Sequence, residues 1–441
     1  MTLAAISLCA LVAALIVSCF STLNVGFLAI VLAWIVGTFI GGMRVDQVLG
    51  GFPTSLFLTL AGITLLFAQA QGNGTLDRLA HRAVRGAGRS PGVIPIIFFA
   101  LTAALSSIGP GNIAATALMA PLGMAAAGRY GIPPFLMAIM IANGASAGSV
   151  SPVTPTGVIV AGITTKIGLE DVRWAVYVNN LIAHAAIALI GYLLFGGWRL
   201  LRERRQPIGA PAAVAATITT SAVDTRVSLP MAGDDAHSSP DDDLHFAWQH
   251  WLTCVVIAAL VVGVVGFNVN VGLGAFAGAV ILTIARAADE HAAVRAMPWP
   301  VIMMVCGVST LVALLERTGG IDLFAAFLAR MSTPATATAV VAFFTGVISI
   351  YSSTTGVVLP ALLPTIPALI ARIGGGDAMD LVSSMIVGGH LVDVSPLSTL
   401  GALCLAAAPR GTDTRAMFNQ LLAWGVSMSV VAAVVCWLVF R

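Results

Sequence analysis

Charged side chains are scarce in this chain: Asp, Glu, Lys and Arg make up 9% of its 441 residues, whereas soluble proteins average roughly 25%. Hydrophobic residues make up 58%, and the mean hydropathy is +0.98. A water-soluble globular domain is therefore excluded, and the composition indicates a polytopic membrane protein. The net charge of +2 by itself says little about partners. Apart from the lipid bilayer we expect a small anionic partner and no nucleic acid.

Signatures of several other protein classes are also missing. Neither a Walker A motif nor an H-E-x-x-H motif occurs, which argues against ATP-driven pumping by this chain and against zinc proteolysis. The six cysteines all fall inside apolar runs without a C-x-x-C pair, so we expect no disulfide and no metal cluster. We therefore expect no enzyme and no cofactor, only Na⁺ or H⁺ as a coupling ion.

Ten-residue segments of alternating hydrophobicity, which are typical of membrane β-barrels, are absent as well. Several apolar runs are instead long enough to cross the bilayer as helices, which takes about 20 residues. The first run, residues 2–20, lacks the basic stretch of a signal peptide and is followed at once by a second span. We expect it to be a retained helix in an all-α fold.

One polar phrase that contains proline occurs twice. "SPVTPTG" occupies residues 151–157 and "SPLSTLG" occupies residues 395–401, at an offset of 244 residues. Further matches lie at an offset of 245: Gly62 with Gly307, Gly74 with Gly319, and Asp77 with Asp322. Several independent matches at nearly one spacing indicate an internal duplication.

Each copy follows the same plan of three spans, a polar arm, a re-entrant hairpin, a span broken at the repeated phrase, and a final span. The hairpins are expected where two short apolar segments flank a polar turn. Five crossings per copy is an odd number, so the copies must be inverted, with about ten spans plus two hairpins in all. The expected units are a first repeat at 1–205 (arm 74–91, hairpin 92–127, broken helix 134–166), a cytoplasmic disordered linker at 206–247, and a second repeat at 248–441 (arm 318–333, hairpin 335–371, broken helix 380–408).

The distribution of basic residues predicts the orientation in the membrane. If the first arm is cytoplasmic, 14 of the 21 Lys and Arg residues lie inside and 7 lie outside. This is the direction that the positive-inside rule requires. We therefore expect a multi-pass protein of a bacterial-type inner membrane, with both termini outside.

The interrupted segments are the candidate binding site. A helix broken at membrane depth frees peptide groups that lipid cannot satisfy, at several kcal/mol each, so such breaks line polar cavities. Freed carbonyls with Ser, Thr and Asn oxygens suit a monovalent cation, and half-helix N-termini suit a carboxylate. The candidate substrate ligands are Asn112, Thr154, Thr156, Thr354, Thr355, Ser398 and Thr399; the candidate cation ligands are Ser107, Gly109, Asn112, Ser151, Ser352, Ser353, Ser395 and Asp393.

Asp393 is a conspicuous ionisable residue of this set, and His390 shortly precedes it. Ionisable groups at membrane depth are functional candidates. Asp393 could ligate a cation or carry a coupling proton. The alternative for the breaks is that they are ordinary proline kinks whose Ser and Thr hydroxyls bond back to the helix. From these residues alone, the expected function is cation-coupled transport of a small anion.

Other functions remain open at this point. "GASAG" at 144–148 formally matches the G-x-S-x-G nucleophile motif, so an intramembrane serine hydrolase that pairs Ser146 with His184 or His390 is a distant alternative. The chain could also be the large membrane subunit of a binding-protein-dependent, TRAP-like transporter. A channel is less favoured, because paired hairpins around a midplane site suggest alternating access.

A resemblance narrows these alternatives. "LFAQAQGNGTLDRLAHRAVRGAGR", "SSIGPGN" and "GSVSPVTPTGVIV" resemble the N-terminal region of the MatC-type malonate/dicarboxylate carriers. The whole plan is similar to the divalent anion:sodium symporters of the ion transporter superfamily. This resemblance implies a malonate- or succinate-like substrate, Na⁺ or H⁺ symport, elevator-type movement and a homodimer. In that family Ser-Asn-Thr signatures at both hairpin tips bind substrate and sodium; here Asn112 matches the first-tip amide, and Thr354 with Thr355 stand at the second tip.

Overall fold

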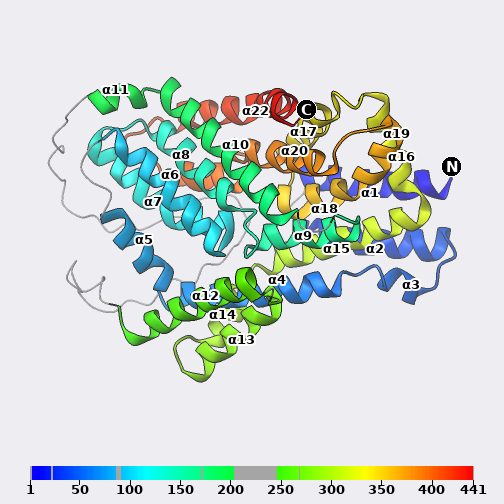
Figure 1. The fold of residues 1–441 in the computed structure, drawn as a ribbon, viewed down its shortest axis with the longest axis horizontal. Coiled ribbons are helices and arrows are strands. Elements are labelled where there is room, and N and C mark those ends of the chain that lie inside the picture. Colours follow the sequence, from blue (N-terminus) through cyan, green and yellow to red (C-terminus); the bar gives the residue numbers. More distant parts are fainter. Residues whose placement is uncertain are drawn as a thin grey trace.

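The computed structural model describes residues 2–20, 23–85, 91–169, 172–202, 246–267 and 269–440. Every element of regular structure in these ranges is helical (Figure 1). The linker expected at 206–247 lies outside the described residues except for its last two, and so do residues 86–90 of the first arm.

The first half begins with two apolar helices. The Asn24 side chain accepts a hydrogen bond from the Gly26 amide and so caps the second of them. A π-helical segment extends that helix to Ile40. The bounds are α1 Leu3–Phe20, α2 Val25–Trp34, η1 Ile35–Ile40, α3 Val45–Leu49, α4 Thr54–Gly72, α5 Thr75–Arg85, α6 Val93–Ile108, α7 Gly111–Tyr130, α8 Pro134–Gly148, α9 Pro155–Lys166, α10 Arg173–Leu194 and α11 Gly197–Arg202.

The second half follows a similar order. Asn270 caps α13 as Asn24 caps α2, and Pro298 precedes α15 as Pro53 precedes α4. The bounds are α12 Trp248–Phe267, α13 Val271–Ile284, α14 Glu290–Ala296, α15 Trp299–Thr318, α16 Gly320–Arg330, α17 Ala337–Ser349, η3 Thr354–Val358, α18 Leu359–Leu362, η4 Leu363–Thr365, α19 Ile366–Ile373, α20 Ala378–Leu391, η5 Val392–Val394, α21 Thr399–Ala406 and α22 Thr414–Val439.

Within the described ranges, 6 helical segments are long and apolar enough to cross a membrane. They are α4, α10, α15, residues 354–373, residues 378–406 and α22. Shorter apolar helices of 10–17 residues accompany them. The expected class, a helical membrane protein with several spans, is confirmed. The total of about ten spans stays a prediction.

Two glycine contacts join the halves. A Cβ atom on Gly307 of α15 would lie 2.1 Å from the carbonyl oxygen of Gly26 in α2. One on Gly62 of α4 would lie 2.4 Å from the carbonyl oxygen of Gly272 in α13. Side chains larger than hydrogen would separate the backbones, so glycine is what lets each helix pair approach this closely.

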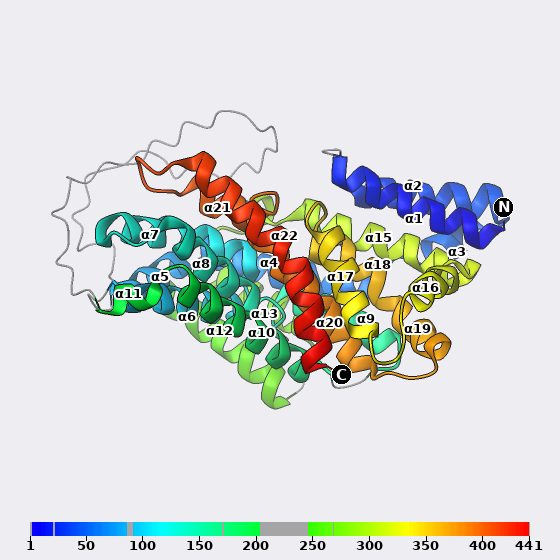
Figure 2. The ribbon, with the colours of Figure 1, turned by 90° about the horizontal axis from the view of Figure 1, so that it is seen from above.

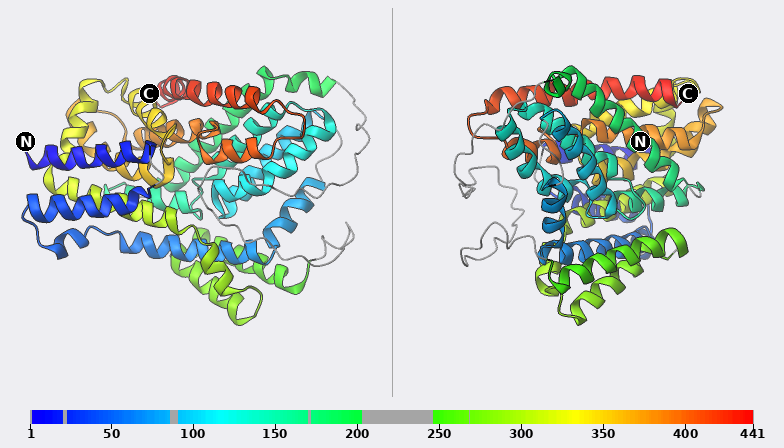
Figure 3. Two further views of the ribbon diagram at one scale, coloured as in Figure 1. Left: turned by 180° about the vertical axis from the view of Figure 1, so that it is seen from behind. Right: turned by 60° about the vertical axis from the view of Figure 1, so that its left-hand side comes forward.

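The two polar arms lie at opposite ends of the molecule. α5 packs on α6 and α7, whereas α16 packs on α19 and on α1 near the N-terminus (Figures 1 and 2). The view from behind shows the same separation (Figure 3). The start of α5 is tied to the second half, because Asn73 Nδ2 donates a hydrogen bond of 2.8 Å to Thr253 Oγ1. Arg82 adds a cation–π contact, with its guanidinium 4.2 Å from the centroid of the Phe246 ring.

Apolar packing forms two cores, one around each hairpin. The first includes Phe98 of α6 and Met119 of α7, and the second includes Leu359 and Leu362 of α18. All residues of α8 from Phe135 to Gly148 and all of α20 from Leu381 to Leu391 are buried. The chain segments that follow α8 and α20 therefore start in the interior of the protein.

Candidate functional site

The first broken span is interrupted between Gly148 and Pro155. The Thr154 hydroxyl donates to the carbonyl oxygens of Ser149 (2.5 Å) and Ser151 (2.7 Å) and accepts from the Gly157 amide (3.1 Å). A Cβ atom on Gly157 would lie 1.9 Å from the Ser151 carbonyl oxygen, so the turn requires glycine there. Thr154 is fully buried. Its hydroxyl bonds with the backbone and fixes the shape of the break.

The second broken span has the same backbone turn with a different use of side chains. α20 ends at Leu391, the 3₁₀ turn η5 carries Asp393, and α21 begins at Thr399. A Cβ atom on Gly401 would lie 2.2 Å from the Ser395 carbonyl oxygen, as at Gly157 in the first break. Ser398 forms no cap hydrogen bond to α21; its hydroxyl donates to Asp393 Oδ1 at 3.3 Å.

The first hairpin turns at Gly109, whose φ of 147° is a conformation that side chains rarely adopt. A Cβ atom there would lie 2.0 Å from the Phe67 ring, so this tip rests directly on α4. Ser107 Oγ donates to the Ala103 carbonyl oxygen (2.7 Å) and lies 3.0 Å from the Tyr177 hydroxyl of α10. The first tip is thus held by its own backbone, by α4 and by α10.

The second hairpin tip reaches the second break. Ser353 Oγ accepts a hydrogen bond of 3.0 Å from the Gly356 amide at the start of η3. Thr354 is buried, and its hydroxyl lies 3.2 Å from the Gly389 carbonyl oxygen and 3.1 Å from Asp393 Oδ1. On its other side the tip packs against α15, since a Cβ atom on Gly356 would lie 2.5 Å from the Met304 sulfur.

Five predicted ligands come together in one region. Thr156 Oγ1 of α9 lies 3.2 Å from Thr355 Oγ1 of the second tip. Asp393 Oδ1 accepts hydrogen bonds from both Thr354 and Ser398. Because Thr354 and Thr355 are neighbours in the chain, these residues form one group. We call it the central cluster: Thr156, Thr354, Thr355, Asp393 and Ser398.

The other predicted ligands are arranged around this cluster. The first tip approaches the first break, since a Cβ atom on Gly111 would lie 3.7 Å from Pro155. Asn112 is half-buried there and accepts a hydrogen bond from the Ile113 amide. In the described part of the chain, no hydrogen bond joins Ser107 or Asn112 to the central cluster. Ser151, Ser352 and Ser395 are buried, whereas Ser353 and Thr399 are exposed.

Sequence reasoning missed two polar links from α10. Tyr177 meets Ser107 across 70 residues, and Asn179 Nδ2 donates to Ser383 Oγ of α20 at 3.0 Å across 204 residues. The available signal was the presence of polar side chains in an otherwise apolar helix. Their partners depend on how distant segments pack, so the sequence alone did not identify them.

The polar residues near Ser146 do not form a catalytic triad. His184 Nδ1 lies 3.0 Å from Asn143 Oδ1, and His390 Nδ1 donates to the Ile386 carbonyl oxygen at 2.9 Å. Asn180 Nδ2 donates to the Ser146 carbonyl oxygen, not to its hydroxyl. Ser146 itself is fully buried inside α8, away from the strand-turn-helix context that a nucleophile elbow needs. This geometry gives the hydrolase alternative no support.

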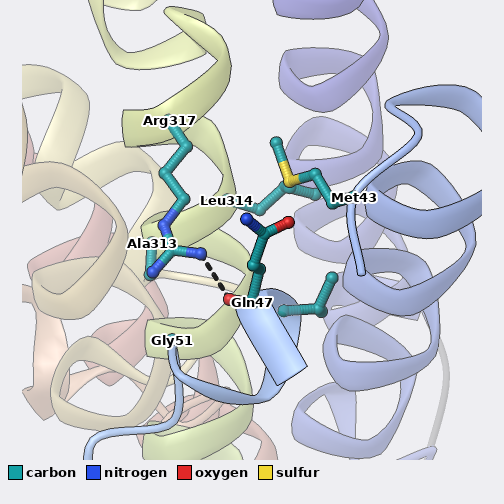
Figure 4. Close-up of a pocket in the computed structure, with 7 residues that line it drawn as sticks. Met43, Gln47, Gly51, Ala313, Leu314 and Arg317 are labelled. Atoms are coloured by element: carbon teal, nitrogen blue, oxygen red, sulfur yellow. Dashed lines mark hydrogen bonds between the residues drawn. The ribbon is translucent and has the colours of Figure 1, made fainter. Parts of the chain in front are cut away.

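A small pocket between α3 and α15 lies near the N-terminal end of the molecule (Figure 4). The Arg317 guanidinium crosses it and donates a hydrogen bond to the Gln47 carbonyl oxygen. Its lining includes none of the predicted ligands. We interpret this hydrogen bond as a structural contact that holds α3 against the end of α15.

Residues 1–149 match the family model described as the N-terminus of the dicarboxylate carrier protein MatC. The resemblance that the sequence of this region suggested is therefore confirmed. The wider similarity to the divalent anion:sodium symporters stays a prediction. The matched family is one of carriers, in agreement with the expectation that this chain is not an enzyme. No curated protein matches the chain.

Two solved structures share the fold. The Alcanivorax borkumensis YdaH transporter has a TM-score of 0.55 and 17% identity, with 89% of this chain and 87% of that chain covered. Neisseria gonorrhoeae MtrF, described within a class of antimetabolite efflux pumps, has a TM-score of 0.54 and 12% identity, with 91% of this chain and 83% of that chain covered. At such identities the likeness is one of fold alone. The fold is thus one that transporters use.

Proposed function

We propose that this chain is a secondary-active carrier that moves a small dicarboxylate, malonate- or succinate-like, together with Na⁺ or H⁺. The observation that carries this proposal is the central cluster, in which two helix breaks and a hairpin tip meet inside an apolar helical protein. Such breaks are stable in a membrane only where they line a polar cavity. The match of residues 1–149 to a dicarboxylate carrier family supports the choice of substrate.

The breaks offer the chemistry that a dicarboxylate requires. α9 and α21 both begin at a break, and a helix N-terminus carries roughly half a positive charge. Two such termini suit the two carboxylates of one small substrate. The hydroxyls of Thr156 and Thr355, which face each other at 3.2 Å, supply donors between them. We assign these two threonines to the substrate.

Asp393 is assigned to the coupling ion. A cation or proton at this carboxylate offsets the negative charge of the substrate and, through Thr354, holds the second tip against the second break. Since both ligands stabilise the same arrangement, each raises the affinity for the other. That reciprocity is the basis of symport.

We further propose two inverted repeats, elevator-type movement and a homodimer in an inner membrane, with the linker cytoplasmic and both termini outside. The arms at opposite ends of the molecule and the glycine contacts between the halves support the inverted arrangement. Both tips rest on long apolar helices, the first on Phe67 of α4 and the second on Met304 of α15. In an elevator movement the tips slide along these helices as the site changes sides.

The test is uptake of labelled malonate and succinate into proteoliposomes that contain only this protein. We expect uptake driven by an inward Na⁺ or proton gradient and abolished by the matching ionophore. Vesicles of the same lipid without protein are the control. If the protein alone fails and uptake appears only with added subunits, the chain is instead part of a binding-protein-dependent transporter.

A further inference from the structure

The two halves can be aligned by their contacts as well as by their sequence. A Cβ atom on Gly144 of α8 would lie 2.5 Å from the Phe99 carbonyl oxygen of α6. One on Gly388 of α20 would lie 2.4 Å from the Ala342 carbonyl oxygen of α17. These two glycines stand at the offset of 244 that also relates the repeated phrases. The helix before each break therefore packs through an equivalent glycine on the first helix of its own hairpin.

The offset of 244 residues also aligns the two breaks residue by residue. Gly157 and Gly401 close on equivalent carbonyl oxygens, those of Ser151 and Ser395. At this offset Thr154 corresponds to Ser398. Position 149 then corresponds to position 393, which compares a serine with an aspartate. The two halves thus differ in charge at a matched position.

In the second half, this position has hydroxyl partners on two sides. Thr354 reaches Asp393 Oδ1 from the hairpin tip at 3.1 Å, and Ser398 reaches it from the start of α21 at 3.3 Å. The residue is only 7% exposed. A charged carboxylate buried with neutral partners alone is costly, so it requires a positive charge or a proton.

At the matched positions, the first half lacks the carboxylate and both of the hydroxyls that face it. Ser149 takes the place of Asp393, and its hydroxyl donates to the Ser146 carbonyl oxygen at 2.7 Å. Thr154 takes the place of Ser398, and its hydroxyl bonds to backbone groups. At the hairpin tip, α7 begins at Gly111 as η3 begins at Thr354, an offset of 243 that also relates Phe99 to Ala342, so Gly111 takes the place of Thr354. Glycine has no hydroxyl to donate.

In the described part of the chain, no side chain near Asp393 supplies the positive charge that its buried carboxylate requires. The elements packed against η5 are α8, α17, α20, α21 and α22. α8 and α17 contain no titratable side chain. His390 of α20 donates its Nδ1 proton to the Ile386 carbonyl oxygen, and the thiol of Cys436 in α22 faces the Ser384 carbonyl oxygen. The three helices α20, α21 and α22 also contain Asp380, Cys404 and Arg415. Within the described residues Asp393 forms no ion pair, and its carboxylate accepts hydrogen bonds from the two hydroxyls.

We propose that the carrier binds a single monovalent coupling cation, at Asp393 between the second tip and the second break, and that the first half binds none. This inference rests on the proposed function for its link to transport, but cation binding itself is independent of the substrate. The first half then contributes its helix terminus and Thr156 to the substrate alone. Only the second half then couples transport to a cation, although the two halves share one plan.

Equilibrium binding of ²²Na⁺ to the purified full chain tests the proposal without any substrate. We expect saturation at a single ion per chain and loss of binding in Asp393→Asn. The matched control is Ser149→Ala, which changes the equivalent position of the first half and should keep the single site. Ser398→Ala removes one hydroxyl and keeps the carboxylate, so it should weaken binding by about 3- to 10-fold without changing the number of ions.

If no Na⁺ binds, the proton is the remaining cation. Infrared difference spectra between acidic and alkaline pH should then show a carboxylic acid band that Asp393→Asn removes and Ser149→Ala retains. Two bound ions per chain, binding that persists in Asp393→Asn, or neither Na⁺ binding nor such a band would each overturn the proposal. A single site in a protein that fails to take up malonate would leave the proposal standing and refute the proposed substrate. Size-exclusion profiles and unfolding temperatures show that each variant is folded.

Discussion

Gly307 packs on Gly26 with so little space that a Cβ atom would lie 2.1 Å from a carbonyl oxygen, and Gly62 packs on Gly272 in the same way. Gly62 and Gly307 are a duplicated pair at an offset of 245 residues. In each case a glycine inside a long helix of one half meets a glycine at the start of an apolar helix of the other. The two contacts exchange roles between the halves, as expected of a two-fold related duplication.

We expect Gly307→Ala to destabilise the protein by about 1–3 kcal/mol, because the added methyl group must push two backbones apart. Gly62→Ala should have a similar effect at the equivalent contact. Gly72→Ala is the control, since a Cβ atom there meets nothing within 4 Å. Thermal unfolding in detergent measures the difference. Unfolding temperatures that are equal for Gly307→Ala and Gly72→Ala would contradict the backbone contact.

Thr156→Val and Thr355→Val should each raise the KM for malonate uptake by about 2- to 10-fold, which corresponds to the loss of one hydrogen bond in a buried site. Thr165→Val is a matched control in the same helix α9, because Thr165 is exposed and its hydroxyl donates to the Ala161 carbonyl oxygen. Initial uptake rates over a range of malonate concentrations give the comparison. An unchanged KM in both variants would remove these threonines from the site.

Thr354 offers a test of the link between the second tip and Asp393. Thr354→Val should raise the cation concentration for half-maximal uptake by about 3- to 10-fold, because the carboxylate loses a hydrogen bond. Thr354→Ser keeps the hydroxyl and should stay close to the wild-type value. A half-maximal cation concentration that is unchanged in Thr354→Val would contradict a role for this hydroxyl.

Asn73 connects the first arm to the second half. Its side chain donates to Thr253 Oγ1 (2.8 Å) and to the Ala287 carbonyl oxygen (3.2 Å). Its Oδ1 also accepts hydrogen bonds from the amide and the hydroxyl of Thr75. Asn73→Ala should therefore lower stability by about 2–4 kcal/mol, the loss of four hydrogen bonds. Gln71→Ala is the control, since Gln71 is exposed and its side chain donates to nearby Asp77 at 3.3 Å. Chemical denaturation followed by tryptophan fluorescence distinguishes the two variants.

Much of the architecture was predictable because it depends on local patterns. The phrase at 151–157 contains two prolines, and helices do end before it and begin again within it. The turn "SSIGPGN" contains Gly109 and Gly111, and both adopt positive φ angles. Breaks, tips and arms of this kind are encoded by residues close together in the chain.

The partners within the site were not predictable in the same way. Thr154 and Ser398 occupy matching places in the two phrases, yet one bonds to backbone and the other to a carboxylate. The sequence paired each tip with the break of its own half, but the contact of Thr156 with Thr355 spans 199 residues, and no local pattern predicts that the second tip also meets α9 of the first half.

The sequence by itself determined that this is a helical membrane protein and predicted where its spans are interrupted, because composition, apolar length and proline and glycine positions act over a few helical turns. Only the tertiary structure decided that Thr354 and Ser398 are the hydroxyls that face Asp393, and that Thr355 meets Thr156 of the first half. Those partners depend on how segments 39 and 199 residues apart pack, where glycine contacts and buried hydrogen bonds fix the positions of the side chains.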